Sequence, residues 1–529
     1  MFKKETAMKE PLILTIDFGT QSVRAGLFNK KGEIVAIEKI KYEPVYNSPK
    51  PGYAEQDPYF YIDSLAKATR PLIEKNKDKV DDILGITMSF FRDSPVILDK
   101  DNKPLRPAIL WLDQRRSDAK RPLSFGRKTL FKLVGMGPTI ELNRKRTMAL
   151  WIQENEPEIW AKVDKYMNLS TFVTMQLLGD YVDSPASQAG HIPIWFKKRK
   201  WYKDGALKGE IYGVENKLLC KLVPVGEVMG TITEEASKKT GLPVGLKMFA
   251  CGSDKSAETF GLGAIDKETA AVSYGTASTV EITVDKYSDA EPFLPAYPSV
   301  VPGYYNLEVQ IYRGYWMLNW FADQFGTAEK LEAEIQNTLA VSVLDKEMLK
   351  IEPGCNGLVL QPYWGPGLRR PLAKGAIIGF SDSHTRIHLY RAIIEGIAFA
   401  LREGMEFFEK KRTHKKVKRI RISGGGSQSD AICQITADIF GLPVSRIQTY
   451  ECSSLGCAMA GFLAAKEFSS PQEAVNAMVH QSIEFKPNLE NHRKYEYLYN
   501  KVYMKMFPQL KNIYSDLKHY EKLIEEKKI

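Results

Sequence analysis

The sequence contains Ile16-Asp17-Phe18-Gly19-Thr20-Gln21-Ser22 and, in its second half, Val272-Ser273-Tyr274-Gly275-Thr276-Ala277-Ser278. In both copies an apolar strand runs into an aromatic residue, Gly-Thr, one variable residue and Ser, and alternating apolar residues follow. This alternation around a short glycine turn predicts a β-hairpin with a Gly-Thr tip. Glycine lets the backbone approach an anion, and main-chain N–H groups and hydroxyls supply donors. The repeat therefore predicts two similar domains whose tips close on one phosphate-bearing ligand.

Length and composition are typical of a globular protein with more than one core. The chain has 529 residues, of which 44% are hydrophobic, and this suits two domains or a few. No apolar run reaches the roughly 18 residues of a membrane helix, and the segment 1–5 lacks the apolar region of a secretion signal. We therefore expect a cytoplasmic protein without a membrane partner.

The pattern of charged and sulfur-containing residues does not indicate binding of nucleic acids or of structural metals. Much of the +10 formal charge lies in scattered lysines and in short clusters such as 197–200 and 410–412, neither of which has a base-stacking aromatic pattern. The six cysteines form no CxxC pair and no metal-ligand spacing with the seven histidines. We expect reduced, mostly buried thiols, no nucleic-acid partner, and a positive field that attracts an anionic nucleotide.

The order of strands and helices is typical of α/β domains. After the first hairpin, the pattern predicts a strand at 33–37, a helix at 58–77, strands at 83–88 and 108–112, and a helix at 147–163. In the second half it predicts helices at 315–340, 385–411 and 430–440, strands at 357–360 and 419–423, and a polar, lysine-rich helix over 488–529. We place the domain boundary near residue 262, which gives domains of 1–262 and 263–529.

Asp17 lies at the end of the first strand, immediately before the first tip. A carboxylate beside phosphates repels them unless a cation intervenes. Because Mg²⁺ keeps several waters and favours few carboxylates, we interpret Asp17 as a magnesium-associated acid that acts through water. The alternative is a turn aspartate at a strand end.

The segment Gly424-Gly425-Gly426-Ser427-Gln428 follows an apolar strand and precedes a helix. Glycines remove side chains, so a flat ring and a ribose can lie on the backbone beside a helix N-terminus. A structural glycine turn is the alternative. The chain has no GxxxxGK[ST] and no complete GxGxxG, so neither a Walker NTPase nor a dinucleotide fold is supported.

Asp254 follows an apolar approach and Gly252, just before a predicted helix at 257–262. Such an acid is often an N-cap. Its place near the domain junction, shortly before the second tip, instead predicts a base that takes the proton of an acceptor hydroxyl during phosphoryl transfer, a contribution of about 10² to 10⁴ in rate.

Beyond these motifs, nearly the whole chain resembles the FGGY carbohydrate kinases, the family of glycerol kinase and xylulokinase. The segments that carry the resemblance are 17–20 (DFGT), 52–58 (GYAEQDP), 107–113 (PAILWLD), 154–160 (ENEPEIW), 252–254 (GSD), 375–379 (GAIIG), 388–395 (HLYRAIIE), 424–426 (GGG) and 454–456 (SLG). The resemblance implies two RNase H-like domains of the actin/hexokinase/Hsp70 type, with mixed β-sheets flanked by helices, that close over ATP, Mg²⁺ and a sugar or polyol.

The resemblance also implies roles for individual residues. Asp254 matches the catalytic base, and Asp17 is the expected metal residue. The expected cofactor-binding residues are Gly19, Thr20, Gln21, Ser22 and Arg24 at the first tip, Gly275 and Thr276 at the second, and Gly425, Gly426 and Gln428 in the adenosine segment.

The expected sugar-binding residues are Arg92, Asp93, Trp111 and Asp254 itself. The pair Arg92-Asp93 resembles the Arg-Glu pair of glycerol kinase and can bind adjacent hydroxyls as donor and acceptor; a surface ion pair is the alternative. Trp111 can stack on a sugar face or belong to the core. His191, in a loop, is a weaker candidate for lining the substrate site.

The sequence therefore predicts ATP-dependent phosphorylation of a small carbohydrate, first of all a pentulose or hexulose such as xylulose. Two departures, Met148 in place of the family's lysine and Phe380 in place of an aliphatic residue, bear on the subfamily rather than on catalysis. Glycerol or another polyol is the alternative substrate, and an actin- or Hsp70-like ATPase without a sugar substrate is the alternative of another class. Whether the chain forms a homodimer stays open.

Overall fold

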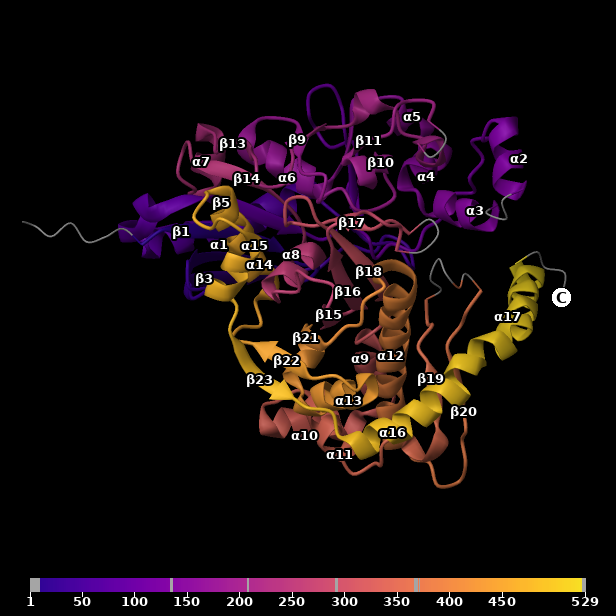
Figure 1. Ribbon diagram of the computed structural model, residues 1–529. Coiled ribbons are helices and arrows are strands. Elements are labelled where there is room, and N and C mark those ends of the chain that lie inside the picture. Colours follow the sequence, from indigo (N-terminus) through magenta and orange to yellow (C-terminus); the bar gives the residue numbers. More distant parts are fainter. Residues whose placement is uncertain are drawn as a thin grey trace, which may run out of the picture.

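The protein is described from a computed structural model that covers residues 10–133, 137–206, 209–290, 294–365, 370 and 372–525. Two mixed β-sheets occupy the two halves of the molecule, and helices α8 (Asp254–Gly261) and α14 (Cys452–Ala464) lie between them (Figure 1). Each sheet has its own apolar core. A third apolar cluster joins strand residues of the first sheet, such as Ile13 and Phe249, to α8 and α14. These two helices therefore lie between the two sheets and pack on the first of them.

The first sheet has the strand order β13-β14-β5-β1-β2-β3. Strands β1 (Leu12–Phe18), β2 (Ser22–Asn29) and β3 (Ile34–Lys41) form an antiparallel meander. Strands β5 (Ile83–Phe90) and β14 (Lys247–Ser253) run parallel to β1, and β13 (Val228–Thr231) closes the edge. Every residue of β1 is buried, as expected for a strand covered on both faces.

The second sheet repeats this topology with the order β17-β18-β16-β15-β21-β22-β23. Its strands are β15 (Thr269–Tyr274), β16 (Ser278–Val284), β17 (Tyr297–Pro298), β18 (Tyr305–Ile311), β21 (Arg419–Ser423), β22 (Val444–Ile447) and β23 (Gln481–Phe485). The antiparallel strands β18, β16 and β15 correspond to β3, β2 and β1, and the parallel strands β21 and β22 correspond to β5 and β14. The predicted pair of mixed sheets flanked by helices is confirmed.

The two Gly-Thr hairpins form as predicted but differ in register. In the first hairpin Phe18 pairs with Val23, and the Gly19 N–H donates to Ser22 O at 3.0 Å. In the second hairpin Tyr274 pairs with Ser278, so one residue fewer lies between the paired strands. The second tip is therefore the tighter of the two.

Several helices differ from the sequence prediction because a proline or a glycine breaks the helix at a place where the apolar pattern continues. The predicted helix 147–163 is α4 (Met148–Asn155) and α5 (Pro157–Trp160), because Pro157 has no N–H and disfavours a helical residue before it. The predicted helix 315–340 is α9 (Trp316–Phe325) and α10 (Thr327–Gln336), with Gly326 between them and α11 (Ala340–Met348) after them.

The C-terminal tail is less polar than its sequence indicates. It forms α16 (Leu489–Leu498), a π-helical turn over 499–503 and α17 (Met504–Glu525); residues 526–529 lie outside the described part. Tyr495, Tyr499 and Tyr503 are buried, and their ring centroids lie 6.0, 5.7 and 5.3 Å from that of Phe399. The part of the tail over 495–503 therefore packs through these tyrosines on α12 (Arg386–Phe408), while Figure 1 shows α17 running away from that helix.

The remaining elements complete the two halves. The other helices are α1 (Pro58–Lys75), α2 (Phe125–Leu133), α3 (Gly137–Arg146), α6 (Leu169–Leu178), α7 (Glu234–Thr240), α13 (Asp430–Phe440) and α15 (Pro471–Met478). The short strands are β4 (Glu55–Gln56), β6 (Pro95–Leu98), β7 (Ala108–Ile109), β8 (Lys165–Asn168), β9 (Val182–Asp183), β10 (Ile194–Trp195), β11 (Lys200–Trp201), β12 (Lys221–Leu222), β19 (Val359–Gln361) and β20 (Ala376–Ile378). Within the described ranges, no helix is both long and apolar enough to cross a bilayer.

Candidate active site

Asp254 is the first residue of α8 and not, as the sequence indicated, a residue preceding the helix. The N-cap is Ser253, whose hydroxyl accepts the Ser256 N–H at 3.4 Å. Asp254 Oδ1 accepts the Lys255 N–H at 2.8 Å. The end of β14 and the start of α8 thus hold the carboxyl at a helix N-terminus, where a negative charge is favoured.

Burial raises the pKa of the Asp254 carboxyl from 3.8 to about 6. The nearby charge of Asp17 adds to this rise, while the cations Lys255 and Arg92 act against it. A base works best when its pKa is close to the operating pH. Asp254 is therefore ionised at neutral pH but retains more affinity for a proton than an exposed aspartate.

Asp17 lies at the end of β1 and is held by two side chains. Ser89 Oγ donates to Asp17 Oδ1 at 2.7 Å, and Arg24 Nη1 lies 3.4 Å from Asp17 Oδ2. Burial raises the pKa of the Asp17 carboxyl, and Arg24 and Ser89 partly counter the rise. Arg24 Nε also lies 2.7 Å from Glu451 Oε2, at the start of α14. The Arg24 guanidinium therefore forms ion pairs with two carboxylates of the protein, Asp17 and Glu451.

The donor set at Asp17 fits a magnesium ion that keeps most of its waters. No group of three or more His, Cys, Asp or Glu side chains with metal-site geometry occurs in the part of the chain described here. The buried Asp17 carboxylate, held by Ser89 and Arg24 and with a second acid, Asp254, in its field, would contact a hydrated Mg²⁺ through water. The residues present are thus compatible with the expected magnesium site.

The two tips offer different surroundings to a phosphate. A Cβ added to Gly19 would be in ordinary van der Waals contact, 3.5 Å from Arg24 Nη1 and from Ser22 O. The Thr20 hydroxyl accepts the indole N–H of Trp111 at 3.1 Å. Gln21 is exposed and Ser22 is buried. At the second tip, the carbonyls of Gly275 and Thr276 accept backbone N–H groups from 315 and 316, at 3.1 and 3.4 Å. Trp111 is therefore half-buried and hydrogen-bonded to the first tip.

The glycine segment 424–426 has two roles: two of its glycines pack on the second hairpin, and one is exposed at the surface. A Cβ on Gly424, whose φ is +82°, would lie 2.7 Å from the Tyr274 backbone, and a Cβ on Gly426 would lie 2.7 Å from Tyr274 Cβ. Gly425 and Gln428 are exposed, and a Cβ on Gly425 would make only an ordinary contact, 3.8 Å from the Tyr315 ring. Two of the three glycines thus make room for the second hairpin itself, and Gly425 alone leaves a free surface.

Arg92 and Asp93 do not form the surface ion pair that the sequence left open. Arg92 Nη2 donates to both carboxylate oxygens of Glu308, at 3.0 and 2.8 Å, and its guanidinium lies 5.1 Å from the Tyr297 ring centroid. Glu308 belongs to β18, so this ion pair links the loop after β5 to the second sheet. With side chains only 15% and 8% exposed, the pair is largely shielded from water.

Asp93 is held instead by His191. The Asp93 carboxylate accepts the His191 N–H at 2.8 Å and lies 2.6 Å from His191 Nδ1. Burial alone raises the pKa of Asp93, but the charge and hydrogen bonds of His191 lower it below the usual value. A Cβ on Gly190, at φ +144°, would lie 2.5 Å from Asp93 Oδ1. Glycine at 190 therefore lets the loop approach this carboxylate.

Sequence reasoning missed a pair of buried acids behind Arg92. Glu281 and Glu308 are register partners on β16 and β18. Burial and the neighbouring Glu308 raise the pKa of Glu281 well above the usual value, whereas Arg92 is bound to Glu308. Thr259 Oγ1 donates to Glu281 Oε2 at 2.8 Å. Glu281 therefore holds a proton more tightly than an ordinary glutamate. The signal in the sequence was one acid within each of two apolar strand patterns.

The second missed group surrounds Glu258 on α8. Lys255 Nζ lies 2.6 Å from Glu258 Oε2 and 3.0 Å from Ser273 Oγ. Glu258 Oε1 accepts the hydroxyls of Ser273 at 3.0 Å and Ser423 at 2.7 Å. The available signal was the spacing of 254 and 258, which places both carboxylates on one face of a helix.

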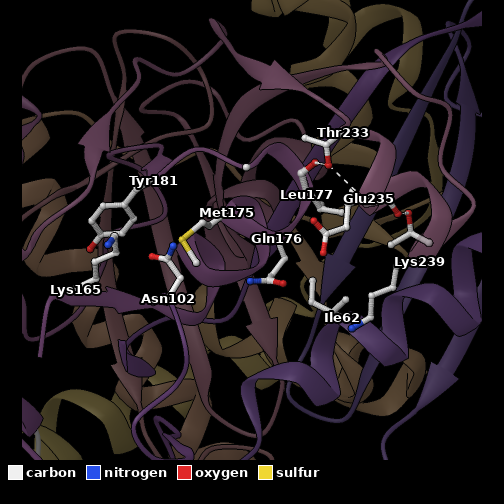
Figure 2. A pocket seen from close by; sticks show the side chains of 13 residues that line it. Ile62, Asn102, Lys165, Met175, Gln176, Leu177, Tyr181, Thr233, Glu235 and Lys239 are labelled. Atoms are coloured by element: carbon white, nitrogen blue, oxygen red, sulfur yellow. Dashed lines mark hydrogen bonds between the residues drawn. The ribbon is translucent and has the colours of Figure 1, made fainter. Parts of the chain in front are cut away.

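Two cavities lie away from these residues. One, of about 410 Å³, is bounded by α1, α6 and α7, and Figure 2 shows Lys165 and Tyr181 at one end of it and Glu235 and Lys239 at the other. The other, of about 470 Å³, is lined by Arg419, Arg421 and residues of α15. None of the candidate site residues lines either cavity.

Family models match most of the chain, including strands of both sheets. The N-terminal domain model of the FGGY family of carbohydrate kinases matches residues 12–261, and the C-terminal domain model matches 270–465. The chain belongs to the FGGY family of carbohydrate kinases. An FGGY kinase is a phosphotransferase that moves phosphate from ATP to an alcohol group of a small sugar, so the alternative of an ATPase without a sugar substrate is set aside.

Relatives of this FGGY chain have different named substrates. It is 31% identical to a xylulose kinase of Lactococcus lactis, over 92% of this chain and 95% of that protein. It is 27% identical to a gluconokinase of Bacillus subtilis, over 96% and 98%. Among solved structures, a gluconate kinase and a xylulose kinase of Lactobacillus acidophilus superpose with TM-scores of 0.81 and 0.80 at 23% and 22% identity; both cover 96% of this chain and 100% of their own. These structures share its fold.

Proposed function

We propose that the chain transfers the γ-phosphoryl group of ATP to a hydroxyl of a five- or six-carbon ketose, with xylulose as the first candidate. The xylulose kinases of Lactococcus lactis and Staphylococcus epidermidis, at 31% and 29% identity, support this substrate class. In our proposal, residues 1–262 bind the sugar and supply the base, and residues 263–529 bind the adenosine.

The observation that carries the mechanism is the state of Asp254. Its carboxyl lies at the start of α8 with a pKa of about 6, within the fields of Asp17 and Arg92. A carboxylate of this kind accepts the proton of the sugar hydroxyl as the oxygen attacks phosphorus. Asp254 is accordingly the base of the proposed reaction.

The phosphates are assigned to the two tips. In this assignment, backbone groups at Gly19, Thr20 and Gly275 face the phosphates. Asp17 would hold a hydrated Mg²⁺, and such an ion would supply positive charge beside the phosphate oxygens. Gln21, Ser22 and Thr276 complete the tips, while Arg24 positions Asp17. Gly425 and Gln428, both exposed, are assigned to the adenosine. Gly426 lies beneath that surface and lets it pack closely on Tyr274.

The sugar is assigned to the region around Arg92, Asp93 and Trp111. Asp93 is fixed by His191, and its carboxylate keeps 34% of its surface exposed, so it can accept a hydroxyl. Arg92 uses one of its nitrogens on Glu308 and retains other donors. Each side chain is therefore fixed by a separate partner and keeps a group for a hydroxyl, Arg92 as donor and Asp93 as acceptor.

A sugar acid is the second candidate substrate, and one local observation favours it. Arg146 lies 5.5 Å from the Tyr312 ring centroid, and its charge contributes to lowering the pKa of Asp93. Burial and this same Arg146 charge lower the pKa of Arg116. Two arginines at the sugar end would bind a carboxylate, and gluconokinases are among the relatives.

We place the protein in the cytoplasm, because its six cysteines are buried free thiols. A screen of the purified protein for ADP release, with ketoses, aldonates, aldoses and polyols, tests the proposal. We expect turnover with a ketose and Mg²⁺, and none without sugar. Turnover with an aldonate alone would transfer the assignment to the second candidate. ADP release that is independent of every sugar would refute both.

A further inference from the structure

Lys255 places a positive charge beside the second Gly-Thr tip. It follows Asp254 on α8, and its side chain is 19% exposed. Its Nζ would lie 4.0 Å from a Cβ on Gly275. The ammonium group is therefore close to the backbone that we assign to phosphate, one residue from the assigned base.

The hydrogen bonds of Lys255 leave one donor available. An ammonium group has three N–H donors. Glu258 Oε2, at 2.6 Å, and Ser273 Oγ, at 3.0 Å, accept two of them. Among the residues that the structure describes, no acceptor takes the third. The side chain is thus fixed by two partners and still able to bind a ligand oxygen.

Glu258 takes the place in the second domain that Asp17 takes in the first. Asp17 and Ser89 are register partners on β1 and β5, and Ser89 donates to Asp17. The matching partners on β15 and β21 are Ser273 and Ser423, and both donate to Glu258. In the second domain the strand residue is therefore Ser273, and the carboxylate comes instead from Glu258 of α8, which is paired with Lys255.

The surroundings keep Lys255 charged. Burial acts against the ammonium form, but the charges of Glu258 and Asp254 raise its pKa above the usual value. The pKa of Glu258 is correspondingly lowered by Lys255 and by its serine donors, although burial opposes this. Lys255 is thus a fixed cation at working pH, and it acts as a hydrogen-bond donor without giving up its proton.

We propose that Lys255 is a further catalytic residue, whose free N–H binds a non-bridging oxygen of the phosphoryl group in transit, and that Glu258 is its positioning residue. The inference rests on the proposed function. The bond from phosphorus to the sugar oxygen forms as the bond to the ADP oxygen breaks. ADP leaves with the bonding electron pair, and the hydroxyl proton goes to Asp254. Lys255 stabilises the charge on the equatorial oxygens, as one fixed donor does in other transfer reactions, with an effect of about 10² to 10³ in kcat.

The test compares Lys255→Met, Lys255→Arg and Glu258→Gln with the wild type and with Lys330→Met, which removes a lysine from the exposed Lys330–Asp323 pair. We expect Lys255→Met to lower kcat by about 10² to 10³ while the KM values change by less than about threefold. Lys255→Arg should recover part of the loss. Lys330→Met should match the wild type.

Binding of ADP with aluminium fluoride and sugar separates catalysis from folding. This mixture mimics the phosphoryl group in transit, so Lys255→Met should weaken its binding about as much as it lowers kcat and leave ADP alone unaffected. Glu258→Gln should lower both quantities less, and it serves as the test if Lys255→Met does not fold. Normal kcat and normal binding of the mimic in either variant would overturn the inference while the wild type remains active. A wild type without sugar-dependent turnover would instead refute the proposed function.

Discussion

Replacing Asp254 by asparagine should make the protein more stable and nearly inactive. The folded state raises the pKa of this carboxyl from 3.8 to about 6. Because one pKa unit corresponds to about 1.4 kcal/mol, the ionised carboxyl costs the folded state at most about 3 kcal/mol at pH 8. Partial exposure and solvent screening reduce this figure, and the attraction of Lys255 and Arg92 is already contained in the shift.

The sign of the effect follows from the two pKa values. Below pH 3.8 the carboxyl is protonated in the folded and the unfolded chain, so asparagine changes little. Between pH 3.8 and about 6 the unfolded chain has given up this proton while the folded chain still holds it, so stability falls across this window and levels off above it. Asp254→Asn removes this loss, so its thermal midpoint should exceed that of the wild type at pH 8, and the two should converge near pH 4.

The assay combines thermal unfolding at several pH values with turnover. We expect sugar-dependent ADP release to fall by about 10² to 10⁴ in Asp254→Asn while ATP binding is retained. Asp57→Asn, at the exposed N-cap of α1, is the control for loss of an acid that is not buried. A lower midpoint at pH 8 than in the wild type, or near-normal turnover, would refute the reasoning.

Three other perturbations test separate parts of the site. Arg92→Ala leaves Glu308 buried opposite Glu281 without its cation, so we expect a lower thermal midpoint and a sugar KM raised at least tenfold with little change in the KM for ATP; an unchanged sugar KM would contradict its role. Removing His191 with His191→Ala should raise the sugar KM but not that for ATP, because Asp93 loses its fixed orientation; equal rises in both would count against this. In the wild type, kcat/KM should rise as pH increases through about 6 and then level off, as Asp254 loses its proton, and a flat profile from pH 5 to 7 would exclude it as the base.

The parts of the fold that depend on local pattern were predictable. The hairpins around Gly19 and Gly275 were found because alternation and a glycine turn are close together in sequence. Helix ends were less accurate where apolar spacing continues across a break. The helices break at Pro157 and at Gly326, although neither position disturbs the apolar period on which the prediction relied. The buried face of the tail was missed because its tyrosines stand among many lysines.

The candidate site was predicted in its residue types but not in its pairings. Asp17, Arg92, Asp93 and Asp254 stood out beside strand ends and glycines. Their partners come from distant segments, such as Glu308 for Arg92 and His191 for Asp93, and one sequence gives no measure of that proximity. The role of the glycines was likewise mixed, since Gly424 and Gly426 fit against Tyr274, which belongs to the other glycine motif.

The most direct test of the central claim is the stoichiometry of a single reaction with xylulose. Purified protein, ATP and Mg²⁺ should release one ADP for each xylulose phosphate formed, and this release should stop when the sugar is consumed and be absent in Asp254→Asn. ADP that accumulates without a phosphorylated sugar, or equally in Asp254→Asn, would contradict the assignment of Asp254 as the base of a sugar kinase. The same experiment with gluconate distinguishes the two substrate classes.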